Sequence, residues 1–174
     1  MSSTEGAEAA RLSRLDELAR ALIRSTRVGA LGTLTAEGSP FVSMVPLLPL
    51  PTELGGKRIA PSWLIHVSAL AAHARQMVAE PRISLLLMAA DHAEAEPLAL
   101  QRLTLNGQAI PLATESSAAQ QARELYLRAF AQAELTVALP DFRFVRLEMH
   151  EARHVAGFGA ARTLDADRLA TLLG

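Results

Sequence analysis

Hydrophobic residues recur at helical spacing near the start of the chain and at alternate positions in several later segments. Over residues 11–25, leucines and an isoleucine recur at the spacing that places them on one face of an amphipathic helix. Residues 1–10 are small and polar, and we expect them to form a disordered tail. The remainder, residues 11–174, is long enough to bury its own core and is predicted to be a single domain.

Six later segments have the composition or the alternation of β-strands. They cover residues 27–34, 40–48, 63–67, 83–88, 102–112 and 142–149. A glycine-containing turn joins the first two as a hairpin, Pro46 places the second at a sheet edge, and Gly107 indicates a bulge in the fifth. Short connections favour antiparallel pairing. With helices expected over residues 69–79, 115–132 and 165–173 as well, the pattern predicts an α+β fold.

The segment from Leu64 to Leu87 is the most informative part of the chain. It consists of an apolar strand, a polar corner, a short helix, a proline and a second strand. Ser68 is expected to cap the helix, and His73 lies where it can donate a hydrogen bond from the first turn. Because free N–H groups at a helix N-terminus attract anions, this corner is a candidate phosphate site.

The composition excludes several classes of function. Aromatic residues make up only 4% of the chain and the formal net charge is -1, which argues against nucleic acid as a partner. The absence of cysteine excludes disulfides, iron–sulfur clusters and thiolate zinc sites, and it fits a cytoplasmic location. There is no signal-peptide core and no run of about 18 apolar residues, so we expect no export and no membrane partner.

Residues 150–154 match the HExxH pattern, in which a helix places two histidines on one face for zinc and the glutamate acts as a general base. Here the pattern directly follows an alternating segment, which favours an extended chain. In a strand His150 and His154 would be roughly 13 Å apart, too far to share one ion. We therefore predict no metal site and interpret both residues as surface or loop histidines.

The order of the motifs resembles that of the pyridoxamine 5'-phosphate oxidase superfamily of FMN-binding split barrels. The likeness covers about residues 15–150 and rests on the successive segments GTLTAEGSPFVSMVPLL, LIHVSALAAHARQMVAEPRISLLL and RLTLNGQA. The resemblance implies a six-stranded antiparallel split β-barrel with flanking helices. It also implies a homodimer that binds FMN, a small-molecule cofactor, at the subunit interface.

The resemblance assigns cofactor contacts to several segments. The matching positions are Ser43, Met44 and Val45 on one strand, His66, Val67 and Ser68 on the next, and the possible phosphate ligands His73, Arg75 and Arg102. The basic pair of the family falls here on Ala72 and His73, and a cofactor-binding glutamine is replaced by Arg102. Arg102 is the better anchor because a guanidinium stays charged and makes bidentate contacts, whereas His73 would hold phosphate in a pH-dependent way.

Each of these residues also has an ordinary structural interpretation. Ser68 can be a plain helix cap, and His66 in an apolar strand can be a core or edge histidine. Arg75 on an amphipathic helix and Arg102 at a strand start can be solvated surface charges. The ordered combination of the motifs, more than any single residue, favours a cofactor site.

Within the superfamily the chain is most similar to the heme-utilisation branch. HVSALAAHARQ, RLTLNG, Asp141 and Phe142 followed by RFVRL, and GFGAA occur here in the order found in that branch. The substrate-phosphate residues of a true pyridoxamine phosphate oxidase are missing, so that activity is not expected. Heme-degrading members ligate iron through a histidine in a C-terminal tail or an extra domain, and no histidine follows His154 here, which argues against heme oxygenase activity.

Three functions from different classes remain open at this point. The preferred one is an FMN-dependent oxidoreductase of unknown substrate, in which the flavin carries out the redox step and the protein binds and orients it. The first alternative is a heme-binding or heme-degrading protein. The second is a flavin carrier without catalysis.

Overall fold

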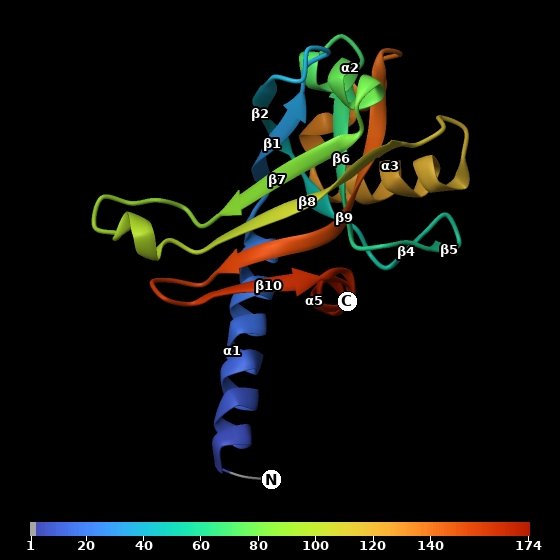
Figure 1. The fold of residues 1–174 in the computed structure, drawn as a ribbon. Helices are drawn as coiled ribbons and strands as arrows, with labels where there is room; N and C mark the ends of the chain where they lie inside the picture. Colours follow the sequence, from blue (N-terminus) through green and yellow to red (C-terminus); the bar gives the residue numbers. More distant parts are fainter. Residues whose placement is uncertain (1–2) are drawn as a thin grey trace.

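A long helix, α1 (Ser3–Ser25), begins inside the segment that was expected to be a disordered tail. The computed structural model describes residues 3–174, so the first two residues of the predicted tail lie outside the described residues. Alanine and glutamate are frequent in the first half of α1, and both favour helical backbone even without a core beside it. This half projects away from the barrel (Figure 1), whereas Ala19, Leu22 and Ile23 are buried. The hydrophobic spacing in the sequence therefore predicted only the half of α1 that packs against the barrel.

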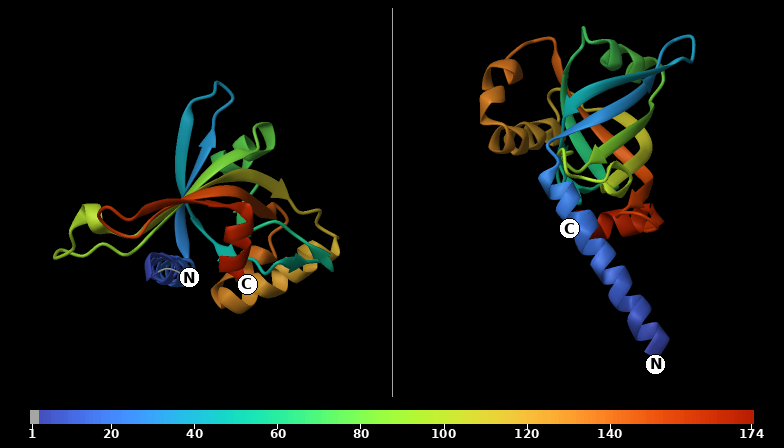
Figure 2. Two further views of the ribbon diagram at one scale, coloured as in Figure 1. Left: turned by 60° about the horizontal axis from the view of Figure 1, so that its bottom comes forward. Right: turned by 90° about the vertical axis from the view of Figure 1, so that its left-hand side faces the viewer.

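Eight antiparallel strands form one curled sheet that makes a half-barrel (Figures 1 and 2). Its order is β2-β1-β7-β8-β9-β6-β3, and β10 pairs with the C-terminal part of β9. The strands are β1 (Val28–Leu34), β2 (Pro40–Pro46), β3 (Leu48–Pro49), β6 (Ser62–Ser68), β7 (Arg82–Met88), β8 (Arg102–Pro111), β9 (Phe142–Val155) and β10 (Ala161–Asp165). The α+β split barrel is confirmed, with β3 and β10 as short additions to the six expected strands.

Two local predictions about the strands are confirmed. β2, which ends at Pro46, lies at one end of the sheet. The register of β8 against β9 shifts between Asn106 and Gly107, which is the predicted bulge. A Cβ at Gly107 would lie 1.9 Å from the Glu148 carbonyl oxygen, so this close approach of two backbones requires glycine.

Four shorter helices flank the sheet, and a small hairpin occupies the proline- and glycine-rich segment between β3 and β6. The helices are α2 (Ala72–Ala79), α3 (Ser117–Ala129), α4 (Glu134–Val137) and α5 (Ala166–Leu173), and the hairpin strands are β4 (Glu53–Leu54) and β5 (Lys57–Arg58). The Ser116 hydroxyl caps α3 by accepting from the Ala119 N–H at 3.1 Å. None of the helices in residues 3–174 has both the length and the hydropathy needed to cross a membrane.

The strand β6 is buried on both faces, and this position divides its side chains between two compartments. Trp63 and Ile65 belong to the main core inside the barrel. Leu64 belongs to a second cluster, where it packs with Tyr126 and Phe130 from α3 and its C-terminal end. The right-hand view of Figure 2 shows α3 and the segment after it as a lobe beside the barrel. Successive residues of β6 therefore face different surroundings.

Candidate functional site

An apolar hollow on the outer surface of β1, β2 and β7 best matches the predicted cofactor region. We call it the apolar trough. It has a volume of about 480 Å³ and is lined by Val28, Gly29, Ala30, Val42, Ser43, Met44, Leu86, Met88, Ala89, Ala90 and Asp91. Val42 and Met44 are 66% and 68% exposed, although both side chains are apolar. Contiguous exposed apolar surface of this kind is typical of a ligand or subunit contact.

The three predicted residues of β2 are divided by the alternation of the strand. Met44 projects outward into the apolar trough, whereas Ser43 and Val45 share the opposite face of the strand; Ser43 still borders the trough, and Val45 is part of the main core. The Ser43 hydroxyl oxygen is buried and has no hydrogen-bond partner among the described residues. The structure therefore places two of the three at a surface where a ligand could bind, and makes the third a packing residue.

Arg102 lies at the edge of the apolar trough. It pairs with Met88 across β8 and β7, and cross-strand partners project from the same face of a sheet. Its Nη1 donates to the Leu100 carbonyl oxygen at 3.2 Å and to the Leu98 carbonyl oxygen at 3.5 Å. A guanidinium has five N–H donors, so several remain for an anionic group at this edge.

His66 and Val67 on β6 face opposite sides of the sheet. Val67 packs in the barrel core, while His66 lies against Phe142 and Phe144 beneath α3. Neither residue lines the apolar trough. The side chains of His66 and Val67 open onto different hollows, so their shared contact with one cofactor stays a prediction of the resemblance.

The prediction that Ser68 caps the following helix is wrong. Its hydroxyl donates to Asp141 Oδ2 at 2.6 Å and accepts from the Leu70 N–H at 3.1 Å, so it closes the corner before the helix. α2 begins only at Ala72, and its N-cap residue Ala71 has no side-chain cap. The strong carboxylate acceptor Asp141, distant in sequence, fixes the hydroxyl in this corner.

His73 and Arg75 lie on α2, and of the two only Arg75 carries a positive charge at neutral pH. Burial lowers the pKa of His73, so its imidazole is neutral at neutral pH. Arg75 donates to the Leu70 carbonyl oxygen and lines a separate hollow of about 250 Å³ together with Val67. The candidate phosphate site is therefore weaker in charge than the sequence suggested.

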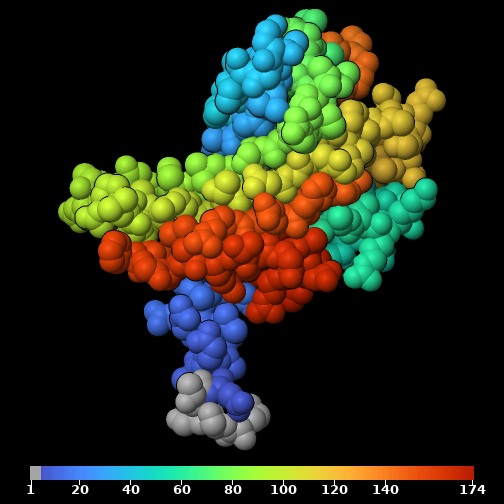
Figure 3. Space-filling model, in the orientation of Figure 1, coloured from blue at the N-terminus to red at the C-terminus, as the bar shows by residue number. Residues whose placement is uncertain are grey.

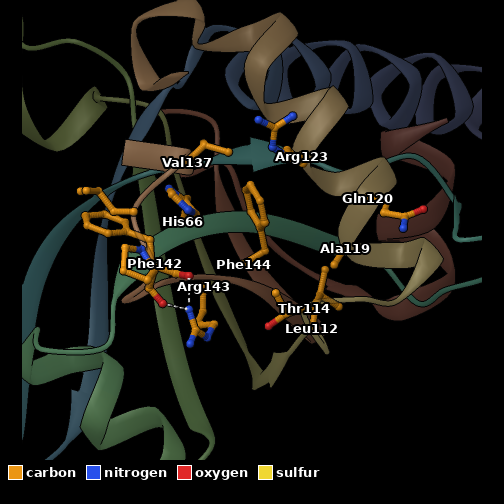
Figure 4. Close-up of a pocket in the computed structure, with 12 residues that line it drawn as sticks. His66, Leu112, Thr114, Ala119, Gln120, Arg123, Val137, Phe142, Arg143 and Phe144 are labelled. Atoms are coloured by element: carbon orange, nitrogen blue, oxygen red, sulfur yellow. Dashed lines mark hydrogen bonds between the residues drawn. The ribbon is translucent and has the colours of Figure 1, made fainter. Parts of the chain in front are cut away.

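His66 lies in a pocket of about 350 Å³ between β6, β9 and α3 (Figure 4). We call it the aromatic pocket. It is lined by His66, Leu112, Thr114, Ala119, Gln120, Arg123, Val137, Leu139, Pro140, Phe142, Arg143 and Phe144. The His66 ring is 4.5 Å from the Phe144 ring and 4.9 Å from the Phe142 ring, measured between centroids. Burial lowers the pKa of His66 to about 4, so the ring is neutral near pH 7.

The HExxH residues lie on β9, so the predicted extended conformation is confirmed. His150 is exposed, but His154 is fully buried, which corrects its interpretation as a surface or loop histidine. His154 Nδ1 accepts from Arg162 Nε at 3.3 Å, and Arg162 Nη1 lies 2.9 Å from Asp16 Oδ1. Arg168 also pairs with Asp16. This buried cluster joins α1 to β9, β10 and α5.

The fold and the trough define an antiparallel split barrel with a ligand-sized apolar hollow on its outer surface. A family model described as pyridoxamine 5'-phosphate oxidase matches residues 15–156. The chain belongs to this family, as the resemblance in the sequence predicted.

Several similar proteins have names that refer to heme. The chain is 33% identical over 156 residues to the chloroplastic heme oxygenase HOZ of Arabidopsis thaliana, across 88% of this chain and 44% of HOZ. It is 28% identical over 148 residues to the heme oxygenase HutZ of Vibrio cholerae, across 80% of this chain and 74% of HutZ. A heme binding protein from Mycobacterium smegmatis has a similar structure, with a TM-score of 0.73, 33% identity, and coverage of 90% of this chain and 60% of that one. The chain thus spans less than half of HOZ.

Sequence reasoning missed most residues of the two hollows. The trough residues Val28, Ala30 and Met88 lie at the outward positions of strands that were predicted, so their alternation was a usable signal. The aromatic pocket gave no such signal, because Arg123 on α3 and Phe144 on β9 meet His66 only after the chain folds. The role of Asp16 was not predictable from the sequence either, because its ion-pair partners lie at the other end of the chain.

Proposed function

We propose that this protein binds heme in the apolar trough. The observation that carries the proposal is a broad apolar surface in which Asp91 is the one charged lining residue and Arg102 lies beside Met88 at the edge. Porphyrin is a flat apolar ring with two carboxylates, so it needs apolar walls and a cationic rim. The names of HOZ, HutZ and the mycobacterial protein support the same ligand.

The residues of the trough fit the macrocycle well. Val28, Met44 and Met88 offer exposed apolar contacts, and Arg102 offers a guanidinium for a propionate group. No histidine of the described chain lines the trough, so the thioethers of Met44 and Met88 are its candidate iron ligands. Heme, when bound, would supply a redox-active iron, while the residues of the trough bind and orient it.

FMN is the second candidate because flavin binding is typical of the split-barrel fold. Its phosphate would need strong cationic ligands near α2. His73 is neutral there at neutral pH because burial lowers its pKa, which leaves Arg75 as the one cation on α2. A flavin-dependent oxidoreductase and a flavin carrier are therefore less well supported than a heme protein.

Titration with hemin tests the proposal directly. We expect the purified protein to give a Soret band that saturates with hemin, and to leave FMN fluorescence unquenched at the same concentrations. Met44→Glu should weaken hemin binding by about tenfold or more, because it places an unpaired carboxylate against an apolar ligand. The measurement is the Soret absorbance against hemin concentration.

Leu135→Glu is the matched control, because Leu135 is 82% exposed and does not line the trough. It should leave the affinity for hemin unchanged. Equal hemin affinities of Met44→Glu and Leu135→Glu would contradict the binding of heme in the trough. Tight binding of FMN without any binding of hemin would contradict the proposal and support the flavin-binding alternative.

We also propose that the trough is closed by a second copy of the chain, as in a homodimer with the cofactor between subunits. Ala30 and Gly32 place no bulky side chain in the middle of this outer face. Val42 and Met44 are exposed apolar residues of the neighbouring strand. Such a surface is self-complementary in a two-fold dimer. Val42→Arg should convert the protein from dimer to monomer in sedimentation velocity at micromolar concentration, whereas Leu135→Arg should not. A wild-type monomer would contradict the proposal.

A further inference from the structure

The aromatic pocket is a second candidate binding site, separate from the apolar trough. The two hollows share no lining residue. The floor of the aromatic pocket comes from β6 and β9, one wall from α3, and the rim from the segment that connects α4 to β9 (Figure 4). Its volume of about 350 Å³ lies within the range of known small-molecule sites, at roughly 300–1,000 Å³.

A buried and unpartnered histidine faces this pocket. His66 is only 9% exposed, and within the described chain neither of its ring nitrogens makes a hydrogen bond. The neutral imidazole presents one N–H donor and one acceptor nitrogen. The ring nitrogens of His66 are not among the buried side-chain atoms without a partner, so they are accessible from the pocket and can bond to a ligand there.

The aromatic residues of the chain gather around His66. The protein has five Phe, one Tyr and one Trp in all, yet Tyr126, Phe130, Phe142 and Phe144 form one connected group of rings here. The flat rings of Phe142 and Phe144 line the pocket itself. A planar ring would stack on them in the offset or tilted geometry that aromatic pairs prefer.

The charge of the pocket favours an anion. Arg123 and Arg143 line it, and none of its lining residues is acidic. Arg143 projects from the opposite face of β9 to Phe142 and Phe144, and its Nη1 donates to the Phe142 carbonyl oxygen at 2.7 Å (Figure 4). Arg123 is exposed on α3 and makes no ion pair within residues 3–174, so its guanidinium is available. The guanidinium of Arg123, at the rim of an apolar site, is suited to one carboxylate.

We propose that the aromatic pocket binds a small planar aromatic carboxylate. Its ring stacks on Phe142 and Phe144, its carboxylate pairs with Arg123 at the rim, and a hydroxyl or ring heteroatom forms a hydrogen bond with His66. This site is independent of the proposed heme site, because no residue lines both hollows.

Binding of 6-hydroxy-2-naphthoate, followed by its fluorescence and by calorimetry, tests the proposal. We expect saturable binding of one molecule per chain. Arg123→Gln should weaken it by about tenfold or more, the scale of a lost hydrogen bond between charged groups. His66→Phe should weaken it by about two- to tenfold while leaving the affinity for unsubstituted 2-naphthoate unchanged, because only the hydroxylated probe bonds to the imidazole.

The matched control is Arg128→Gln, which removes an exposed arginine from the same helix at a position outside the pocket. It should leave probe binding unchanged. Equal losses in Arg123→Gln and Arg128→Gln, or no binding of the probe at millimolar concentration, would overturn the proposal. Hemin titration of Arg123→Gln separates the two sites, because its Soret curve should match that of the wild type.

A measurement on the wild-type protein covers the case in which His66→Phe fails to fold. In NMR spectra of ¹⁵N-histidine protein, the probe should shift the ring nitrogens of His66 and leave those of exposed His92 and His150 in place. Shifts of equal size at all three histidines, or none at His66, would contradict direct contact in the aromatic pocket.

Discussion

Replacing Asp16 with leucine is expected to lower the free energy of unfolding by about 3–5 kcal/mol, the usual cost of removing one partner from a buried ion pair. Asp16 is 5% exposed and forms ion pairs with both Arg162 and Arg168. Without the carboxylate, the buried guanidinium of Arg162 loses its counter-charge, and its Nη2 already lacks a hydrogen-bond partner within the described residues. Denaturant unfolding followed by the fluorescence of Trp63 measures the effect.

Two further variants show whether the loss belongs to the ion pair. Glu17→Leu changes the neighbouring exposed acid on α1 and should alter stability by less than about 0.5 kcal/mol. Asp16→Leu combined with Arg162→Met should be more stable than Asp16→Leu alone, because the uncompensated charge is then absent. If Asp16→Leu lowers the free energy of unfolding by less than about 1 kcal/mol, solvent screens the charges of this cluster.

Acidification is expected to destabilise the protein through its two buried histidines. Burial lowers the pKa of His66 to about 4, and burial together with the positive charge of Arg162 lowers that of His154 to about 4. In the unfolded chain a histidine has a pKa of about 6.5, so below that pH the unfolded state binds protons that the native state does not. Stability should therefore be full above pH 7, fall between about pH 6.5 and 4, and lose up to about 3 kcal/mol for each histidine.

Unfolding free energies measured in steps from pH 7.5 to 4.5 test this dependence. Other groups titrate in the same range, so the informative quantity is the difference in slope between variants. His154→Gln and His66→Phe should each reduce the slope, and the double variant should reduce it most. The reduction should be smaller for His66, because the surrounding rings partly stabilise its cation. Parallel pH profiles for wild type and both variants would contradict the assignment of these pKa shifts to the native state.

Much of the fold was predictable because the relevant signals are local. Composition or alternation marked the six main strands, Pro46 marked the sheet edge, and Gly107 marked the bulge, since each acts on the backbone at its own position. The order of motifs was enough to identify the family, and the family model confirmed it. The unpacked half of α1 was missed because helix propensity, with no hydrophobic periodicity, decides its conformation.

The candidate sites depended on contacts that join distant segments. Alternation in β6 determined that His66 and Val67 face opposite ways, but not that α3 would cover His66 or that the barrel core would enclose Val67. Ser68 looked like a helix cap until Asp141 was brought beside it.

The sequence by itself determined the strands, their edges and the family, because backbone preferences and side-chain periodicity act over a few residues. Only the tertiary structure decided which surface each strand presents to solvent, to the core or to a ligand. The physical reason is that a strand pattern specifies two faces, whereas burial, pKa and charge at each face depend on the segments that pack against it. The apolar trough and the aromatic pocket are both products of that packing.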